Sequence, residues 1–244
     1  MKPYEASLWN FGSESRLVVL TGAGVSAESG LSTFRDAGGL WEKHRVVDVC
    51  TPEALERNPS LVIGFYNERR AQLPQVQPNP AHQALARLAD RLGSRMLLVT
   101  QNVDDLHERA GHPREHLLHM HGQLLQLRCT RDESHVVDWQ GDQAVDSPCP
   151  ICHRGTLRPN IVFFGEIPLG MDRIEEALGR CTHFAYIGTS SQVYPAAGFK
   201  AFARQNGACT LCLNLEVESD SSTDLFWQGK AGTIVPEWVD SFSK

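Results

Sequence analysis

LVVLTGAGVSAESG, residues 17–30, decides the fold. Its first four residues form a continuous apolar run, which is typical of a strand buried on both faces of a parallel sheet. Glycines and small residues follow at once, beginning with Gly22, Ala23 and Gly24. Such a turn lets the backbone approach a pyrophosphate, whose charge the N–H groups of a following helix would meet. Position 27 is Ala, so the spacing departs from the G-x-G-x-x-G pattern of NAD-dependent dehydrogenases.

Similar apolar runs recur along the chain, and helical patterns lie between them. The runs are residues 96–99, 184–187 and 210–213, and the helical patterns are residues 81–92, 174–178 and about 196–204. Strands that alternate with helices predict an α/β fold, a Rossmann-like parallel sheet with helices on both faces.

Two stretches break this alternation. Residues 31–78 hold a loop and then helical segments, and residues 123–159 are polar, poor in predicted strands and rich in cysteine. We expect them to form a smaller domain, made of a helical insertion and a zinc-ribbon-like module. The Rossmann-like part is then expected to comprise residues of about 15–30, 79–122 and 160–240, within one catalytic unit spanning residues 1–244.

Composition restricts the class of protein. A chain of 244 residues with 41% hydrophobic residues can bury a sizeable core. The net charge of −6 does not suit a nucleic-acid partner, which usually meets a basic face. Neither a secretory leader nor a membrane span is expected, because the first fourteen residues lack an apolar run and no segment approaches ~20 apolar residues. Seven cysteines, two of them in Cys149-Pro-Ile-Cys152, therefore indicate thiols or metal ligands in a cytoplasmic protein.

Polar tripeptides follow two of the predicted strands. Gly188-Thr189-Ser190 can bond phosphate or ribose, and Asn214-Leu215-Glu216 brings a carboxylate that can accept ribose hydroxyl protons. Open α/β sheets bind ligands where such strand ends meet. Together with the glycine-rich turn, these loops predict a dinucleotide site.

A further cluster carries the chemistry. Thr100-Gln101-Asn102-Val103-Asp104 follows the second apolar run, and its amide and carboxylate groups suit nicotinamide and its ribose. His119-Met120-His121-Gly122 comes next, and a His beside a Gly is well placed to act as a general base close to bound ligand. The alternative for the two histidines is simple packing at a domain junction.

These motifs, in this order, resemble the signature of the sirtuin family. They are GAGVS at 22–26, TFR at 33–35, TQNVD at 100–104, HMHG at 119–122, RP at 158–159, FGE at 164–166, GTS at 188–190 and NLE at 214–216. The resemblance runs from about residue 15 to residue 238, and it is strongest to the bacterial sirtuins that also remove acidic acyl groups. It implies NAD-dependent removal of acetyl, succinyl or malonyl groups from lysines, with acylated proteins or peptides as partners.

The resemblance also implies roles for individual residues. His121 would be the general base, and Asn102, beside the nicotinamide ribose, would be a second catalytic residue. NAD, consumed as a co-substrate, would contact Gly22, Ala23, Gly24, Ser26, Ala27, Phe34, Arg35, Trp41, Gln101, Asn102, Val103, Asp104, Gly188, Thr189, Ser190, Asn214, Leu215, Glu216 and Ala231. The acylated lysine would contact Tyr66, Arg69, Val162 and Phe164.

The same resemblance implies the order of the reaction. The acyl oxygen attacks C1′ of the nicotinamide ribose and expels nicotinamide. A ribose hydroxyl, deprotonated with the help of His121, then attacks the resulting imidate. The products are free lysine, nicotinamide and O-acyl-ADP-ribose.

Tyr66 and Arg69 are the residues expected to bind the acyl group. They lie three residues apart in a helical pattern, so both can point from one helix face. Arginine pairs bidentately with a carboxylate, and tyrosine can donate its hydroxyl. Sirtuins with this Tyr-x-x-Arg pair remove succinyl and malonyl groups, although Arg70 is a competing arginine one position away.

The metal site is the least complete motif. Sirtuins hold a structural zinc on two cysteine pairs. Here Cys149 and Cys152 form one pair, whereas Cys129 stands alone, with Asp132 and His135 nearby. Three outcomes stay open: zinc on the three cysteines plus an Asp or His, zinc with a water, or no zinc.

Three other functions are less consistent with the sequence than deacylation. A protein ADP-ribosyltransferase would attack the same ribose carbon, but it has no need of an acyl-carboxylate clamp. A non-catalytic NAD-binding module would be expected to lack His121, Asn102 or Asp104, and all three are present. A dehydrogenase is the least consistent with the glycine spacing.

Overall fold

The computed structural model describes residues 2–32, 40–41, 44–190, 192–216 and 223–242. Within them, seven strands form a sheet in the order β1-β12-β11-β10-β2-β5-β6, and every neighbouring pair is parallel. The strands are β1 (Lys2–Pro3), β2 (Leu17–Thr21), β5 (Met96–Thr100), β6 (Leu117–His119), β10 (His183–Ile187), β11 (Cys209–Asn214) and β12 (Leu225–Gln228). The parallel sheet expected from the four apolar runs is confirmed.

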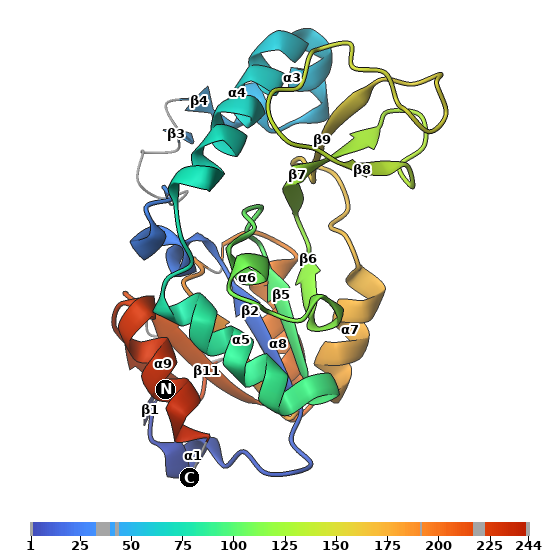
Figure 1. Cartoon of the computed structure of the whole chain (residues 1–244). Coiled ribbons are helices and arrows are strands. Elements are labelled where there is room, and N and C mark those ends of the chain that lie inside the picture. The colour runs from blue at the N-terminus through green and yellow to red at the C-terminus, as the bar shows by residue number, and fades with distance from the viewer. Residues whose placement is uncertain (1, 33–39, 42–43, 191, 217–222, 243–244) are drawn as a thin grey trace.

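Helices cover both faces of this sheet (Figure 1). The long ones are α5 (Pro80–Leu92) and α9 (Ala231–Ser241) on one face, and α7 (Met171–Arg180) and α8 (Ala196–Gln205) on the other. Alternate residues of β2 explain this arrangement, because successive side chains of a strand point to opposite faces. Leu17 and Val19 pack against α5 and α9, whereas Val18 and Leu20 pack against α7 and α8.

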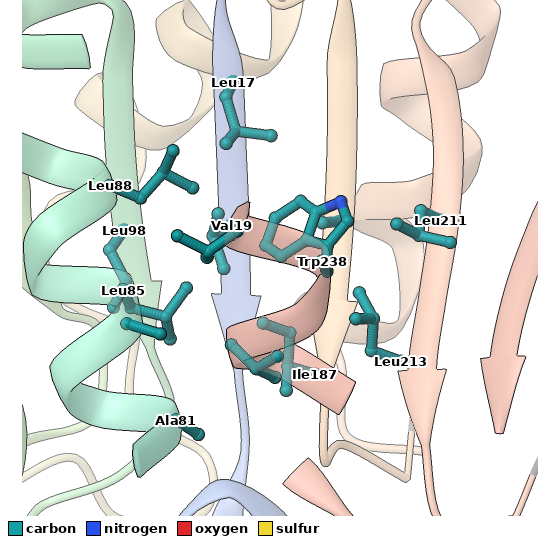
Figure 2. Close-up of a cluster of buried hydrophobic side chains, with 14 of the residues drawn as sticks. Leu17, Val19, Ala81, Leu85, Leu88, Leu98, Ile187, Leu211, Leu213 and Trp238 are labelled. Carbon is teal, nitrogen blue, oxygen red and sulfur yellow. The ribbon is translucent and has the colours of Figure 1, made fainter. Parts of the chain in front are cut away.

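The first of these two cores is drawn in Figure 2. Leu85 and Leu88 of α5 and Trp238 of α9 lie over Val19 and its neighbours on the sheet. Trp238 and Leu88 are fully buried. The sequence does not predict the helix α9, although it supplies Trp238, one of the two buried tryptophans of this core.

A smaller part of the chain lies beyond the carboxyl ends of the central strands (Figure 1). It joins a group of helices to an antiparallel sheet of order β8-β7-β9. Its elements are α2 (Val46–Val49), α3 (Pro52–Arg57), α4 (Pro59–Gln72), β7 (Gly122–Cys129), β8 (Val136–Asp138) and β9 (Leu157–Ile161). The prediction that residues 123–159 are poor in strands is therefore wrong, since β7 alone is eight residues long.

Apolar side chains hold the helical group against this sheet. Phe65 and Tyr66 of α4 pack with Leu124 of β7 and Ile161 of β9. Short elements complete the fold: α1 (Ala6–Trp9), β3 (Leu40–Trp41), β4 (His44–Arg45) and α6 (Leu106–Arg109). That the two parts behave as separate domains, with the boundaries given above, stays a prediction. Among the described helices, none is long and apolar enough to cross a membrane.

Candidate active site

A cavity of about 740 Å³ lies between the carboxyl ends of the parallel strands and the smaller part. Loops that follow β2, β5, β10 and β11 line one side of it, and α4, β7 and the segment after β9 line the other. Most of the residues named from the sequence line this one cavity. They are Gly22, Ala23, Gly24, Ser26, Ala27, Arg69, Gln101, Asn102, Val103, Asp104, His121, Val162, Phe164, Gly188, Thr189, Ser190, Asn214, Leu215, Glu216 and Ala231.

Four of the residues named for NAD or the acylated lysine do not belong to this set. Phe34 and Arg35 lie outside the described residues, and only the backbone of Trp41 is described, in the short strand β3. Tyr66 is fully buried and is absent from the cavity lining.

The floor of the cavity depends on two backbones that almost touch. A Cβ atom on Gly24 would lie 2.7 Å from Cα of Gly188, closer than real Cβ contacts come. Gly188 also has a φ of +58°, a left-handed conformation that favours glycine. The loops after β2 and β10 therefore meet only because both residues lack a side chain. The expected helix after the first loop is replaced by two short 3-10 turns, residues 23–25 and 27–29.

Ser26 is the centre of a buried hydrogen-bond network. Its hydroxyl donates to Oδ2 of Asp104 at 3.0 Å and accepts from Nδ2 of Asn102 at 3.0 Å. The backbone N–H of Asn79 donates to Nδ1 of His82, so Nε2 of His82 carries the proton and donates to Ser26 at 3.3 Å. Burial lowers the pKa of His82 to about 4, which agrees with this neutral ring.

Asp104 keeps a carboxylate in this enclosed place. Burial raises its pKa, while the backbone N–H of Leu106 and the hydroxyl of Ser26 act in the opposite direction. The loop that carries Asn102 and Asp104 thus presents an amide and a carboxylate with fixed orientations.

His121 lies where the chain passes from β6 to β7. Its Nδ1 donates to the carbonyl oxygen of Gln101 at 3.1 Å. That bond fixes the tautomer and leaves Nε2 as the nitrogen that can accept a proton. Burial lowers the pKa of His121, and the bond to Gln101 opposes that effect only in part. The ring is therefore an unprotonated base at neutral pH.

The helix α4 separates the two arginines that the sequence left in competition. Arg69 lines the cavity, with its guanidinium carbon 5.5 Å from the ring centre of Phe65. Arg70 faces away from it and donates to the backbone carbonyls of Leu124 and Gly141. The second arginine thus ties α4 to the antiparallel sheet.

Tyr66 lies one layer behind the cavity. Its hydroxyl donates to Sγ of Cys50 at 3.3 Å, and Cys50 itself lines the cavity. The ring stacks on Phe163 with centres 5.9 Å apart. In this arrangement Tyr66 shapes the wall through its neighbours.

The segment after β9 forms the opposite wall. The strand β9 ends at Ile161, and the apolar residues Val162, Phe163 and Phe164 continue it as a loop. Val162 N donates to the carbonyl of His121 and Phe164 N to that of Cys50, both at 3.0 Å. The carboxylate of Glu166 ties this loop to β9, because it accepts hydrogen bonds from the backbone N–H of Phe163 at 2.7 Å and from Arg158 at 2.6 Å.

Comparison with known proteins now identifies the family. A family model described as the Sir2 family matches residues 22–195. The chain is also 53% identical over 233 residues to an NAD-dependent protein deacylase of Salmonella typhimurium, covering 94% of this chain and 84% of that protein. The chain belongs to the Sir2 family.

Further relatives of this Sir2-family chain agree. A protein of Escherichia coli named NAD-dependent protein deacylase is 53% identical over 234 residues, with 94% of this chain and 82% of that protein covered. Among solved structures, a Sir2 homologue in complex with NAD has a TM-score of 0.86 at 35% identity, covering 98% of this chain and 94% of the other. A structure of Sir2 bound to acetylated peptide has a TM-score of 0.77 at 26% identity, with 94% of each chain covered.

The cysteines of this Sir2-family chain converge with one histidine. Ligand atoms of Cys129, His135, Cys149 and Cys152 all lie within 4.8 Å of one another. Sγ of Cys129 and Sγ of Cys152 are 3.6 Å apart, close to the ~3.8 Å that two thiolates span across a tetrahedral zinc. Three thiols and an imidazole form a donor set that zinc prefers, so the residues fit the metal.

The structure also distinguishes the two candidates for the fourth ligand. Nδ1 of His135 is 4.0 Å from Sγ of Cys149, whereas its Nε2 lies 3.4 Å from Oδ2 of Asp132. Zinc-bound histidines commonly donate their second N–H to a carboxylate. His135 therefore suits the ligand position, and Asp132 suits the supporting one.

Several lining residues of the Sir2-family cavity were not foreseen. They include Glu28, Cys50, Gln192, Val193, Tyr194 and Lys230. Lys230 directly precedes α9, whose buried residues Ile234, Val235, Trp238 and Val239 have helical spacing. That spacing was a usable signal for the helix, and hence for the loop before it.

Proposed function

We propose that the chain removes acyl groups from protein lysines and consumes NAD in doing so. The observation that carries this proposal is the presence of His121 in the same cavity as the Ser26–Asn102–Asp104 network and the strand-end loops. The deacylase relatives and the Sir2 structures with NAD and acetylated peptide support the same function.

NAD would lie along the strand ends. The loops at Gly24 and Gly188 border the cavity without side chains and would face the pyrophosphate, and Glu216 offers a carboxylate to the adenosine ribose. Asn102 and Asp104, held by Ser26, would face the nicotinamide ribose. Gln101, whose side chain donates to Thr189, would join the two halves of the site. The other NAD contacts proposed from the sequence are assigned in the same way, either to the adenosine and pyrophosphate half or to the nicotinamide ribose half.

The chemistry then requires one proton acceptor and a dry pocket. The acyl oxygen attacks C1′ of the ribose, and nicotinamide leaves with the bonding electrons. Nε2 of His121 assists removal of a ribose hydroxyl proton, and the alkoxide adds to the imidate carbon. Water completes the release of lysine and O-acyl-ADP-ribose. Exclusion of bulk water during the first step prevents simple hydrolysis of NAD, and Val162 and Phe164 supply apolar walls.

Arg69 indicates which acyl groups the cavity accepts. A guanidinium that borders the cavity can pair with the terminal carboxylate of a succinyl or malonyl chain. We therefore propose that the chain removes acidic acyl groups as well as acetyl groups. Tyr66 would contribute through Cys50 and the shape of the wall, with direct contact requiring movement of its buried hydroxyl.

Zinc would act as a structural ion. Its proposed ligands lie in the antiparallel module rather than in the cavity, so it would staple β7 to the loop that carries Cys149 and Cys152. The partners are acylated proteins or peptides. A cytoplasmic location and the absence of nucleic-acid and membrane partners stay predictions from composition.

The test is release of nicotinamide from NAD in the presence of acetyl-lysine or succinyl-lysine peptides of identical sequence. Wild-type protein should release nicotinamide with both. His121→Ala should lower the rate by about 10²–10⁴-fold, the usual contribution of a general base. His116→Ala, which changes a histidine outside the cavity, should behave like wild type.

Two results would refute the proposal. One is the absence of nicotinamide release with every acyl peptide. The other is release that labels the protein substrate with ADP-ribose and leaves the acyl group in place, which would identify a transferase. Full activity of a folded His121→Ala variant would refute the role of the base.

A further inference from the structure

The loop that carries Asn102 and Asp104 is attached at four successive carbonyl oxygens. All four accept hydrogen bonds from residues 119–124, which run from the last residue of β6 into β7. The pairs, acceptor first, are Thr100 with Met120 N at 3.0 Å, Gln101 with His121 Nδ1 at 3.1 Å, Asn102 with His119 Nδ1 at 3.1 Å, and Val103 with Leu124 N at 2.9 Å. Apart from the ring of His121, the groups that hold this loop in position are ones that the reaction itself does not use.

His119 differs from the other three donors because its second nitrogen is also engaged. Nε2 lies 2.7 Å from Oε1 of Glu108, a residue of α6. Both partners of the ring, the Asn102 carbonyl and the Glu108 carboxylate, accept hydrogen bonds. A neutral imidazole has one donor nitrogen, so with Glu108 ionised only the doubly protonated ring can make both bonds. The two contacts are therefore those of a buried imidazolium paired with a carboxylate.

The electrostatics of the pair agree with this requirement. Burial by itself lowers the pKa of His119, but the hydrogen bond and charge of Glu108 outweigh it and raise that pKa above its ordinary value. Burial likewise raises the pKa of Glu108, and His119 outweighs it and lowers that pKa. Each group keeps its partner charged, as expected of a buried ion pair.

The other ionisable groups around the pair are few. Asp104 favours the charge on His119, and Arg114 favours the charge on Glu108. His107 faces His119 as a neutral ring, because burial holds its pKa well below the ordinary value. The charge of Glu108 also raises the pKa of Asp105 and opposes the lowering of the pKa of His112 by burial. Within the described part of the chain, Oε2 of Glu108 has no hydrogen-bond partner. His119 is thus the group that explains a carboxylate in this place.

We propose that Glu108 and His119 are positioning residues for the NAD-binding loop. Glu108 holds the His119 ring doubly protonated, and Nδ1 of His119 fixes the carbonyl of Asn102. The side chains of Asn102 and Asp104 are thereby presented to the nicotinamide ribose in one orientation. This inference rests on the proposed function, and it assigns a role to the first histidine of the HMHG motif.

The first test separates the hydrogen bond from the rest of the side chain. His119→Leu removes the donor, whereas the amide nitrogen of His119→Asn takes nearly the place of Nδ1 and can still donate to Asn102. We expect His119→Leu to raise the KM and the dissociation constant for NAD about tenfold, the effect of one lost charge-assisted bond. His119→Asn should recover most of that loss, and the KM for the acyl peptide should not change. Glu115→Gln, an exposed glutamate nearby, is the matched control.

Two kinetic results would overturn the proposal. One is unchanged NAD affinity in a folded His119→Leu variant. The other is a folded His119→Asn variant that binds NAD no better than His119→Leu. Circular dichroism and a thermal melt establish folding in each case.

The second test does not depend on activity or on the stability of the His119 variants. The ring carbon and nitrogen resonances of His119 report its protonation directly in the intact protein. We expect a cationic ring at pH 7 in the wild type and a neutral ring at pH 7 in Glu108→Gln, because the amide can donate to Nε2 but carries no charge. A neutral ring in the wild type, or a cationic ring in Glu108→Gln, would overturn the pairing. Absence of NAD turnover with a cationic His119 would instead count against the proposed function alone.

Discussion

The hydroxyl of Ser26 donates a 3.0 Å hydrogen bond to the carboxylate of Asp104, and the direction of that bond is fixed. Asn102 and His82 both donate to the serine oxygen, so the single hydroxyl proton of Ser26 can be donated only to Asp104. Ser26 therefore stabilises the ionised carboxylate and orients the Asn102 amide at the same time. This relationship links the glycine-rich turn to the loop proposed to hold the nicotinamide ribose.

Removal of this hydroxyl should weaken the use of NAD. Ser26→Ala leaves the buried Asp104 without one donor and frees the Asn102 amide. We expect kcat/KM for NAD to fall about tenfold or more, the effect of leaving a buried charged group short of one hydrogen bond. Steady-state kinetics at saturating acyl peptide measure it. Ser60→Ala, on the exposed start of α4, should have no effect, and equal kinetics of the two variants would contradict the role of Ser26.

Arg69→Met should change acyl preference without changing the fold. The apolar side chain keeps much of the volume and loses the partner for an acyl carboxylate, so desuccinylation should fall about 10- to 100-fold while deacetylation is retained. Nicotinamide release with matched peptides measures both. A parallel loss of the two activities would contradict the assignment.

Arg70→Met is the informative companion to that variant. Arg70 holds the carbonyls of Leu124 and Gly141, so its loss should reduce the free energy of unfolding by about 2 kcal/mol. It should lower both activities equally, in proportion to the folded fraction. Denaturant unfolding measures the stability change, and an unchanged midpoint would show that the buried bonds contribute little.

The pH dependence of kcat/KM should report His121. Its pKa lies below the ordinary value of 6.5, because burial disfavours the charged ring. The base is then mostly unprotonated at neutral pH, so the rate should be close to its maximum at pH 7 and should fall as the pH decreases and the ring becomes protonated. The profile of His116→Ala should superimpose on that of the wild type. A rate that is half-maximal above pH 7 would contradict the assignment of the free base.

Zinc binding should depend on His135. His135→Ala removes one of four donors and should strongly reduce metal content and lower the melting temperature of the protein. Asp132→Asn should weaken zinc only about 10- to 100-fold, as loss of a supporting carboxylate does. Elemental analysis and competition with a chelator measure both. His153→Asn, exposed in the same module, should keep full zinc, and full zinc in His135→Ala would exclude the histidine as a ligand.

The central sheet was predictable because burial on both faces leaves a simple pattern. Each of the four central strands is an apolar run of four or more residues, and the turn after each run carries the polar groups of the site. Parallel strands bring those turns to one edge of the sheet. The prediction of parallel strands was therefore enough to place most of the cavity-lining residues together.

The features that the sequence did not predict have physical explanations. β7 pairs with β9 through a register shift between Gly122 and Leu127, and this irregularity breaks the period-two alternation that predicts a strand. α9 contains Pro236, a residue that ordinarily ends a helix. The different placements of Arg69, Arg70 and Tyr66 depend on how α4 is rotated against the antiparallel sheet, which spacing does not specify. The Glu108–His119 pair joins a helix to a strand end, and such a contact exists only in three dimensions.

The chain crosses from one sheet to the other within two residues, because β6 ends at His119 and β7 begins at Gly122. Gly122 has a φ of +84°, and a Cβ atom there would meet the carbonyl oxygen of Asn160 at 1.9 Å. This junction therefore tolerates neither a side chain at Gly122 nor a change in the number of residues. An exchange of the whole metal module between relatives should succeed when the seams are cut inside β7 and β9, beyond Gly122 and before Asn160. A seam cut at the crossing itself would displace the base with every residue inserted or removed.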